Sequence, residues 1–221
     1  MILQVICRFL PKFTFTIFYS AMYTYLALGD SYTIGEQVAL EDNFPYQTVK
    51  LLKEARIEVA DPVIVAKTGW TTDELAQALR EEGIKETFSL VTLLIGVNNQ
   101  YRGRDLDNNR KEFTALLEQA IVFANGHTQN VFVLSIPDWG VTPFAEGKDR
   151  DEIATAIDGY NNANKSITLA HKANWLDITD STRQNGANTG FLVEDGLHPS
   201  AKEYAIWAER LANEIKKVLK G

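Results

Sequence analysis

Four short segments of the chain carry side chains whose types suit acyl-transfer chemistry. Ser31 follows Gly29-Asp30 at the end of a short apolar run, and His198 follows Asp195 by three residues across a glycine. A carboxylate at that spacing can turn back to one imidazole nitrogen, which leaves the other nitrogen to act as a general base. Because serine is a poor nucleophile without such a base, the sequence favours a unit of Ser31, His198 and Asp195.

The two remaining segments can supply hydrogen-bond donors for a developing oxyanion. Gly69 lies in a predicted turn, where a glycine allows close approach of the backbone and leaves its N–H free. Asn98 follows the most apolar stretch of the chain and can direct its side-chain amide to the same place. Tetrahedral intermediates need preplaced donors, and we expect them to be the N–H groups of Ser31 and Gly69 and the amide of Asn98. Each segment alone is typical of an ordinary turn or capping loop; their combination favours catalysis.

Strands that alternate with helices must position these segments. Apolar runs predict strands at 23–28, 57–66, 88–95, 130–136 and 175–178. Helical periodicity predicts helices at 44–56, 71–82, 110–125, 151–172 and 199–219. This alternation predicts a parallel sheet in the order 2-1-3-4-5, covered by helices on both faces. The strand at 88–95 should be central, the strand at 57–66 should lie at an edge because of Pro62, and 96–109 and 179–194 should be loops.

The segments GDSYTIG, KTG, GVNN and DGLHP resemble the four sequence blocks of the SGNH/GDSL hydrolase family, and the resemblance extends over about residues 23–219. It implies an α/β fold of three layers (αβα) with a flavodoxin-like five-stranded parallel sheet. The site residues that it implies are the nucleophile Ser31, the base His198 with Asp195 behind it, and the oxyanion donors Ser31, Gly69 and Asn98.

One position departs from that family pattern. The third block often ends in Asn-Asp, whereas Asn99 replaces the acid here. Because the donor Asn98 is retained, the departure affects a secondary contact rather than catalysis. The Gly-x-Ser-x-Gly signature of the α/β-hydrolase fold is absent from the sequence.

Composition limits the partners and cofactors. The formal net charge is −7 and no basic cluster is present, so nucleic acid and anionic membrane surfaces are poor partners. With Cys7 as the only cysteine, neither an internal disulfide nor a cysteine-based metal site can form. We expect no cofactor, no metal and no stable membrane insertion, and the oligomeric state stays open.

Residues 1–21 form an N-terminal extension that differs from the predicted hydrolase domain, 22–221. The extension has basic residues at Arg8 and Lys12, a short apolar core and small residues at its end, as in a signal peptide. It is too short to span a membrane. The alternatives are an upstream start codon, with Met22 as the natural start, and an ordered extra element. A signal peptide would make the protein periplasmic or secreted; otherwise it would be cytoplasmic.

These observations predict a serine esterase that works through an acyl-enzyme and acts on a small-molecule ester. We expect a lysophospholipase- or arylesterase-like activity, with carbohydrate O-deacetylation or thioester hydrolysis as the alternative. A non-catalytic binding module on the same scaffold is the alternative from another class, but such modules usually lack the nucleophile or the base. Aromatic residues that could line the substrate pocket, or pack in the core or at the rim, are Tyr32, Trp70, Tyr101, Trp139, Phe144 and Phe191.

Overall fold

The computed structural model describes residues 22–219, and its elements alternate as the sequence predicts. The strands are β1 (Tyr25–Asp30), β2 (Val63–Lys67), β3 (Leu90–Leu94), β4 (Val131–Leu134) and β5 (Asn174–Leu176). The α-helices are α1 (Ser31–Ile34), α2 (Phe44–Glu54), α3 (Thr72–Glu82), α4 (Val97–Tyr101), α5 (Leu106–Phe123), α6 (Arg150–Ala170), α7 (Thr179–Asn185) and α8 (Ala201–Leu219). Short 3₁₀ turns are η1 (Leu40–Asp42), η2 (Thr128–Asn130), η3 (Trp139–Val141), η4 (Pro143–Ala145) and η5 (Thr189–Phe191).

The five strands form one parallel sheet in the order β2-β1-β3-β4-β5. The predicted order, the central place of β3 and the edge position of β2 are therefore confirmed. Gly29 of β1 pairs with Ala66 of β2 on one side and with Leu94 of β3 on the other. Since the strands are parallel and in this register, the chain leaves β1, β2 and β3 at one edge of the sheet.

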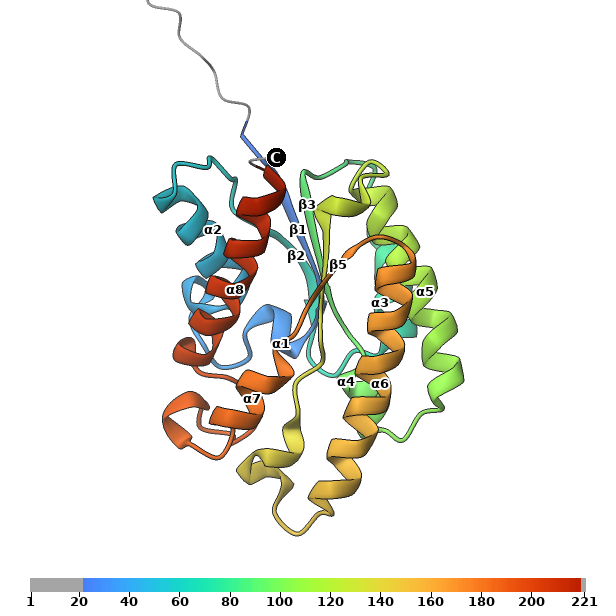
Figure 1. Cartoon of the computed structure of the whole chain (residues 1–221), viewed down its shortest axis with the longest axis vertical. Helices are drawn as coiled ribbons and strands as arrows, with labels where there is room; N and C mark the ends of the chain where they lie inside the picture. Colours follow the sequence, from blue (N-terminus) through green and yellow to red (C-terminus); the bar gives the residue numbers. More distant parts are fainter. Residues whose placement is uncertain (1–21, 220–221) are drawn as a thin grey trace, which may run out of the picture.

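Helices cover both faces, which confirms the three-layer architecture (Figure 1). Helices α2 and α8 lie on one side of the sheet, and α3 and α5 lie on the other, next to α6. Alternate side chains of β1 enter the two cores: Tyr25 and Ala27 face the first helical layer, and Leu26 and Leu28 face the second. This period of two, with apolar residues at every position, explains why the strand reads as a continuous apolar run.

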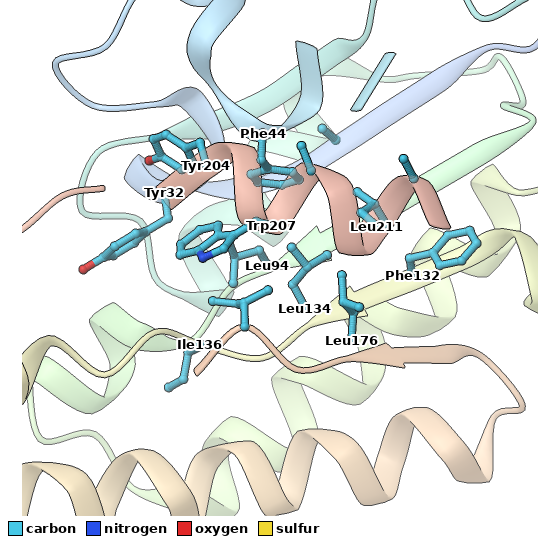
Figure 2. Packing of buried hydrophobic residues seen from close by; sticks show 14 of the residues in the cluster. Tyr32, Phe44, Leu94, Phe132, Leu134, Ile136, Leu176, Tyr204, Trp207 and Leu211 are labelled. Carbon is cyan, nitrogen blue, oxygen red and sulfur yellow. The ribbon is translucent and has the colours of Figure 1, made fainter. Parts of the chain in front are cut away.

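The first core is organised around α8. Trp207 and Leu211 are fully buried, and Figure 2 shows them between Phe44 of α2 and the sheet residues Leu94 and Leu134. The apolar positions of this helix recur every three to four residues, so that one face meets the sheet. The helix therefore holds the loop that precedes it, which carries His198, against the edge of the sheet.

Three predictions about local structure are wrong in part. Helix α4 lies inside the predicted loop 96–109, and α5 begins at Leu106 rather than at 110. Helix α7 lies inside the predicted loop 179–194. Both short helices are rich in polar residues, and tertiary hydrogen bonds satisfy those side chains, as in the contact of Ile136 O with Thr179 Oγ1 at 2.8 Å. A stripe of apolar residues, which would have revealed them, is therefore missing.

The predicted strand at 57–66 is also shorter in the structure. Only Val63–Lys67 pairs continuously with β1, while Val59 forms a single bridge with Tyr23. Pro62 separates the two parts, and because proline has no N–H it cannot donate to the ladder. Residues 1–21, with the interpretations offered for them, lie outside the described residues. None of the described helices is long and apolar enough to cross a membrane.

Candidate active site

Ser31 lies where β1 ends and the single-turn helix α1 begins. The Asp30 side chain caps this turn by accepting a hydrogen bond from the N–H of Tyr32 at 3.0 Å. A glycine is required at position 29, just before this turn, because a Cβ there would lie 2.1 Å from Thr33 Oγ1. Ser31 is 4% exposed. Its hydroxyl is therefore held on a rigid turn at the carboxyl edge of the sheet.

The loop before α8 folds back on itself through Gly196, whose φ of +65° is readily adopted by glycine. One oxygen of Asp195 accepts the N–H groups of Leu197 and His198 at 2.8 and 2.9 Å, and the other lies 2.6 Å from His198 Nδ1. Partial burial acts to raise the pKa of Asp195, but the hydrogen bonds from the His198 ring and from the two backbone N–H groups hold it below its usual value.

The opposite nitrogen of the imidazole meets the serine. His198 Nε2 lies 2.9 Å from Ser31 Oγ, across a sequence separation of 167 residues. A carboxylate can only accept, so Nδ1 carries the proton that faces Asp195 and Nε2 is free to accept from the hydroxyl. The three predicted side chains are therefore brought together in the order in which a base can activate a nucleophile.

Gly69 and Asn98 border the same space. Gly69 lies in the turn after β2 with φ +83°, and its N–H has no acceptor among residues 22–219. Asn98, the second residue of α4, has its Nδ2 atom 3.0 Å from the carbonyl oxygen of Trp70 and 3.4 Å from a carboxyl oxygen of Asp30. Both residues line the cavity above Ser31, so both predicted donors lie at the site.

Asn99, the residue that departs from the family pattern, does not line that cavity. It is fully buried. Its Oδ1 accepts the N–H of Thr72 at 3.0 Å, and its Nδ2 donates to the Thr72 hydroxyl at 2.6 Å. Asn99 therefore fixes the first turn of α3 to α4, as expected for a secondary contact.

Sequence reasoning did not single out Asp30. Its carboxyl group is fully buried and forms no ion pair within the described part of the chain. Burial raises the pKa of Asp30 to about 7, and the hydrogen bonds from the N–H of Tyr32 and the amide of Asn98 oppose that rise. The available signal was the position of an acid directly between an apolar strand and Ser31.

The cavity above Ser31 measures about 160 Å³ and is mostly apolar. It is lined by Ser31, Tyr32, Thr68, Gly69, Val97, Asn98, Tyr101, Trp139, Phe144, Leu197 and His198. A second, smaller cavity of about 20 Å³ adjoins it, and Tyr32, Trp139 and Leu197 border both spaces. These three side chains therefore lie between the two cavities.

Four of the six aromatic residues considered from the sequence line the cavity. Tyr101, Trp139 and Phe144 form one cluster, with ring centroids 5.2 to 6.0 Å apart. The indole of Trp139 is fixed by a hydrogen bond of 2.7 Å to Gln100. Tyr32 packs against His198, with their ring centroids 5.0 Å apart. The other two lie elsewhere, Trp70 against the second core and Phe191 at the smaller cavity.

The other two histidines lie away from this site. His127 directly precedes the 3₁₀ turn η2. His171 caps the end of α6, where its Nδ1 lies 2.9 Å from the Ile167 carbonyl oxygen. Neither contacts the cavity.

Solved structures share this architecture at low sequence identity. A lipase/acylhydrolase from Enterococcus faecalis is 22% identical, over 89% of this chain and 96% of that one, with a TM-score of 0.69. The acetylxylan esterase Axe2 from Geobacillus stearothermophilus is 19% identical, over 87% and 94%, with a TM-score of 0.68. The psychrotrophic esterase EstA from Pseudoalteromonas sp. is 16% identical, over 90% and 100%, with a TM-score of 0.65. These likenesses show the fold.

A search of curated protein sequences returns no significant match. The model of the GDSL-like lipase/acylhydrolase family matches residues 27–206, which is most of the chain. That span contains all four motif segments and every residue of the site described above. The chain therefore belongs to the GDSL-like lipase/acylhydrolase family, and it is a hydrolase that acts on ester bonds.

Proposed function

We propose that this hydrolase cleaves carboxylic esters through an acyl-enzyme formed on Ser31. The observation that supports the proposal most directly is the contact of 2.9 Å between Ser31 Oγ and His198 Nε2, with Asp195 on the opposite nitrogen. The pair lies at the cavity that would receive the ester.

The proposed reaction follows from this arrangement. As Ser31 Oγ attacks the ester carbon, its proton passes to His198 Nε2, and the carbonyl electron pair moves onto oxygen. The N–H groups of Ser31 and Gly69 and the amide of Asn98 stabilise that oxyanion. The intermediate then breaks the bond to the alcohol oxygen, which takes the proton from His198. Water repeats the sequence on the acyl-enzyme, releases the acid and restores the serine.

The shape of the cavity favours a short acyl group. Sites for drug-sized ligands typically measure about 300–1,000 Å³, whereas this one holds about 160 Å³ and has Tyr32, Trp139 and Leu197 in its wall. We therefore favour short-chain aryl or alkyl esters. The long chain of a lysophospholipid would have to leave the cavity past Tyr101 and Phe144, which are 48% and 40% exposed.

Carbohydrate O-deacetylation is the second candidate, for a specific reason. A more open, polar groove of about 490 Å³ shares Tyr101 and Trp139 with the cavity and is also bordered by Asp149, Glu152 and Tyr160. Aromatic faces beside polar side chains suit a sugar ring, and Axe2, with the same fold, is an acetylxylan esterase. In this alternative the acetyl group would occupy the apolar cavity and the sugar would lie in the groove.

A panel of substrates tests both candidates. We would measure kcat/KM for p-nitrophenyl acetate, butyrate, octanoate and palmitate, and for acetylated xylo-oligosaccharides, a lysophosphatidylcholine and an acyl thioester. Ser31→Ala should abolish turnover of every substrate while the circular dichroism spectrum stays unchanged. Retained turnover in that variant would remove Ser31 from the mechanism, and a preference for palmitate would refute the short-acyl assignment.

A further inference from the structure

The turn that carries Gly69 is held from outside by side chains of α4 and its C-cap. Asn98 and Arg102 are four residues apart, so they project from the same face of the helical turn. Asn98 donates to the carbonyl oxygen of Trp70 at 3.0 Å, and Arg102 Nη2 donates to the carbonyl oxygen of Gly69 at 2.7 Å. Two consecutive carbonyl groups of the turn are therefore fixed by one short helix.

The contact of Arg102 with Gly69 is short and charge-assisted, which makes it stronger than an ordinary hydrogen bond. Among residues 22–219, and leaving aside the two chain neighbours of Gly69, the guanidinium supplies the only heavy atom within 4 Å of an ideal Cβ at Gly69, at 3.6 Å. A second contact, of 3.4 Å, ties the same side chain to Glu74 in the first turn of α3. The arginine thus joins the turn to the first turn of the helix that follows it.

We propose that Arg102 is a positioning residue for the oxyanion hole: by binding the carbonyl oxygen of Gly69 it fixes the peptide that follows Gly69, and this limits the rotation about Gly69 that would turn the residue's own N–H away from the cavity. A glycine at positive φ can rotate its flanking peptides at little cost, because it has no Cβ to restrict them. Without the guanidinium, the N–H would sample orientations that miss the oxyanion. Arg102 does not line the cavity and acts only through Gly69.

Three substitutions test this proposal, which rests on the proposed hydrolysis through Ser31. Arg102→Met removes both contacts, and Arg102→Lys restores a charged donor of similar reach. Arg210→Met is the matched control, because Arg210 also binds one backbone carbonyl, that of Asp177 at 3.0 Å, and one carboxylate, that of Asp180, on another side of the molecule. The side chains of Arg102 and Arg210 are 42% and 32% exposed, so both variants should fold.

Steady-state kinetics on p-nitrophenyl acetate give the first readout. Losing an oxyanion donor outright typically costs about 10²–10³ in rate, so loosening one should lower kcat about tenfold in Arg102→Met, with KM nearly unchanged. Arg102→Lys should recover most of that loss, and Arg210→Met should stay within about twofold of the wild type. If the ratio of the wild-type kcat to the Arg102→Met kcat stays the same at high salt, the loss reflects positioning, because salt would screen a long-range effect of the arginine charge on the reaction.

A boronic acid that forms a tetrahedral, anionic adduct with a serine oxygen gives the second readout. Its inhibition constant should rise in Arg102→Met by the same factor by which kcat/KM falls, because both report binding in the oxyanion hole. If Arg102 served only as a structural salt bridge, Arg102→Met would lower the melting temperature but leave kcat/KM and the inhibition constant unchanged.

The possible failures are distinguishable. If Ser31→Ala is inactive while Arg102→Met keeps the wild-type kcat, only the positioning role is overturned. If the loss in Arg102→Met disappears at high salt, or equals the loss in Arg210→Met, the role is overturned as well. If Ser31→Ala stays active, the proposed function itself fails.

Discussion

Replacing Asp30 by asparagine should make the protein more stable at alkaline pH. The Asp30 carboxyl is fully buried and has no cationic partner among residues 22–219. Burial raises its pKa from the ordinary 3.8 to about 7. Above that pH the folded chain must hold a buried, uncompensated charge, whereas the unfolded chain holds the same charge in water. Asparagine has nearly the same shape and carries no charge.

The magnitude follows from the size of that shift. A rise from 3.8 to about 7 is about three pKa units, and at 1.36 kcal/mol each this is about 4 kcal/mol. Since the folded state binds this proton more tightly than the unfolded state, its stabilising contribution is complete below about pH 4 and is lost as the pH rises to about 7.

The substitution also has a cost. The two oxygens of Asp30 contact the N–H of Tyr32 and the amide of Asn98, and asparagine has only one oxygen. Losing one hydrogen bond costs about 1 kcal/mol. The expected net gain at pH 8 is therefore about 3 kcal/mol, or roughly 6–12 °C in melting temperature for a domain of this size.

Urea denaturation at pH 5 and at pH 8 provides the assay. Asp30→Asn should be more stable than the wild type at pH 8, and the difference should shrink strongly at pH 5. The matched control is Asp138→Asn, because Asp138 is also buried but lies 2.8 Å from Arg183 Nε. Asp138→Asn removes the charge that Arg183 neutralises instead of an unpaired one, so this control should be destabilised at both pH values. Equal differences for Asp30→Asn at the two pH values would refute the reasoning.

Three further outcomes are expected. Asp195→Asn should keep the fold but lower kcat by up to about 10⁴, and a near-normal kcat would remove Asp195 from the mechanism. Asn98→Ala should lower kcat by about 10²–10³ with little change in KM, while Asn99→Ala should mainly lower the melting temperature; kinetics and thermal denaturation of both variants would reveal a reversed assignment. A chain that begins at Met22 should fold and keep full ester hydrolysis, and an insoluble or inactive product would place residues 1–21 within the folded domain.

The sheet was predictable because its strands lie between two helical layers. Every residue of β1 and β3 is buried, and most of these residues are apolar, so each strand stands out from the polar segments around it. Helix α4 was not predictable in the same way. Its sequence, VNNQY, contains two large apolar residues, and tertiary contacts of Asn98 and Asn99 hold the helix in place.

The residues of the candidate site also differ in how far they could be predicted from the sequence. Ser31, Asp195 and His198 were predictable because a short spacing or a strand end fixes each locally. Asp30 and Arg102 were not, because their importance depends on partners distant in sequence. Arg102 contacts Gly69 across 33 residues, and the pKa of Asp30 depends on how completely the rest of the fold excludes water.

Partners that are distant in sequence also explain why position 99 holds an asparagine instead of an aspartate. Its amide donates to the hydroxyl of Thr72, and that hydroxyl in turn donates to a carboxylate oxygen of Glu112. A hydroxyl has one proton to give. An aspartate at position 99 would demand that proton for itself and leave two carboxylates facing one donor, whereas the asparagine supplies its own N–H and leaves the Thr72 proton for Glu112. The departure from the common Asn-Asp pair is therefore compatible with Glu112 on α5, and the start of α3 keeps its hydrogen bonds to both Asn99 and Glu112.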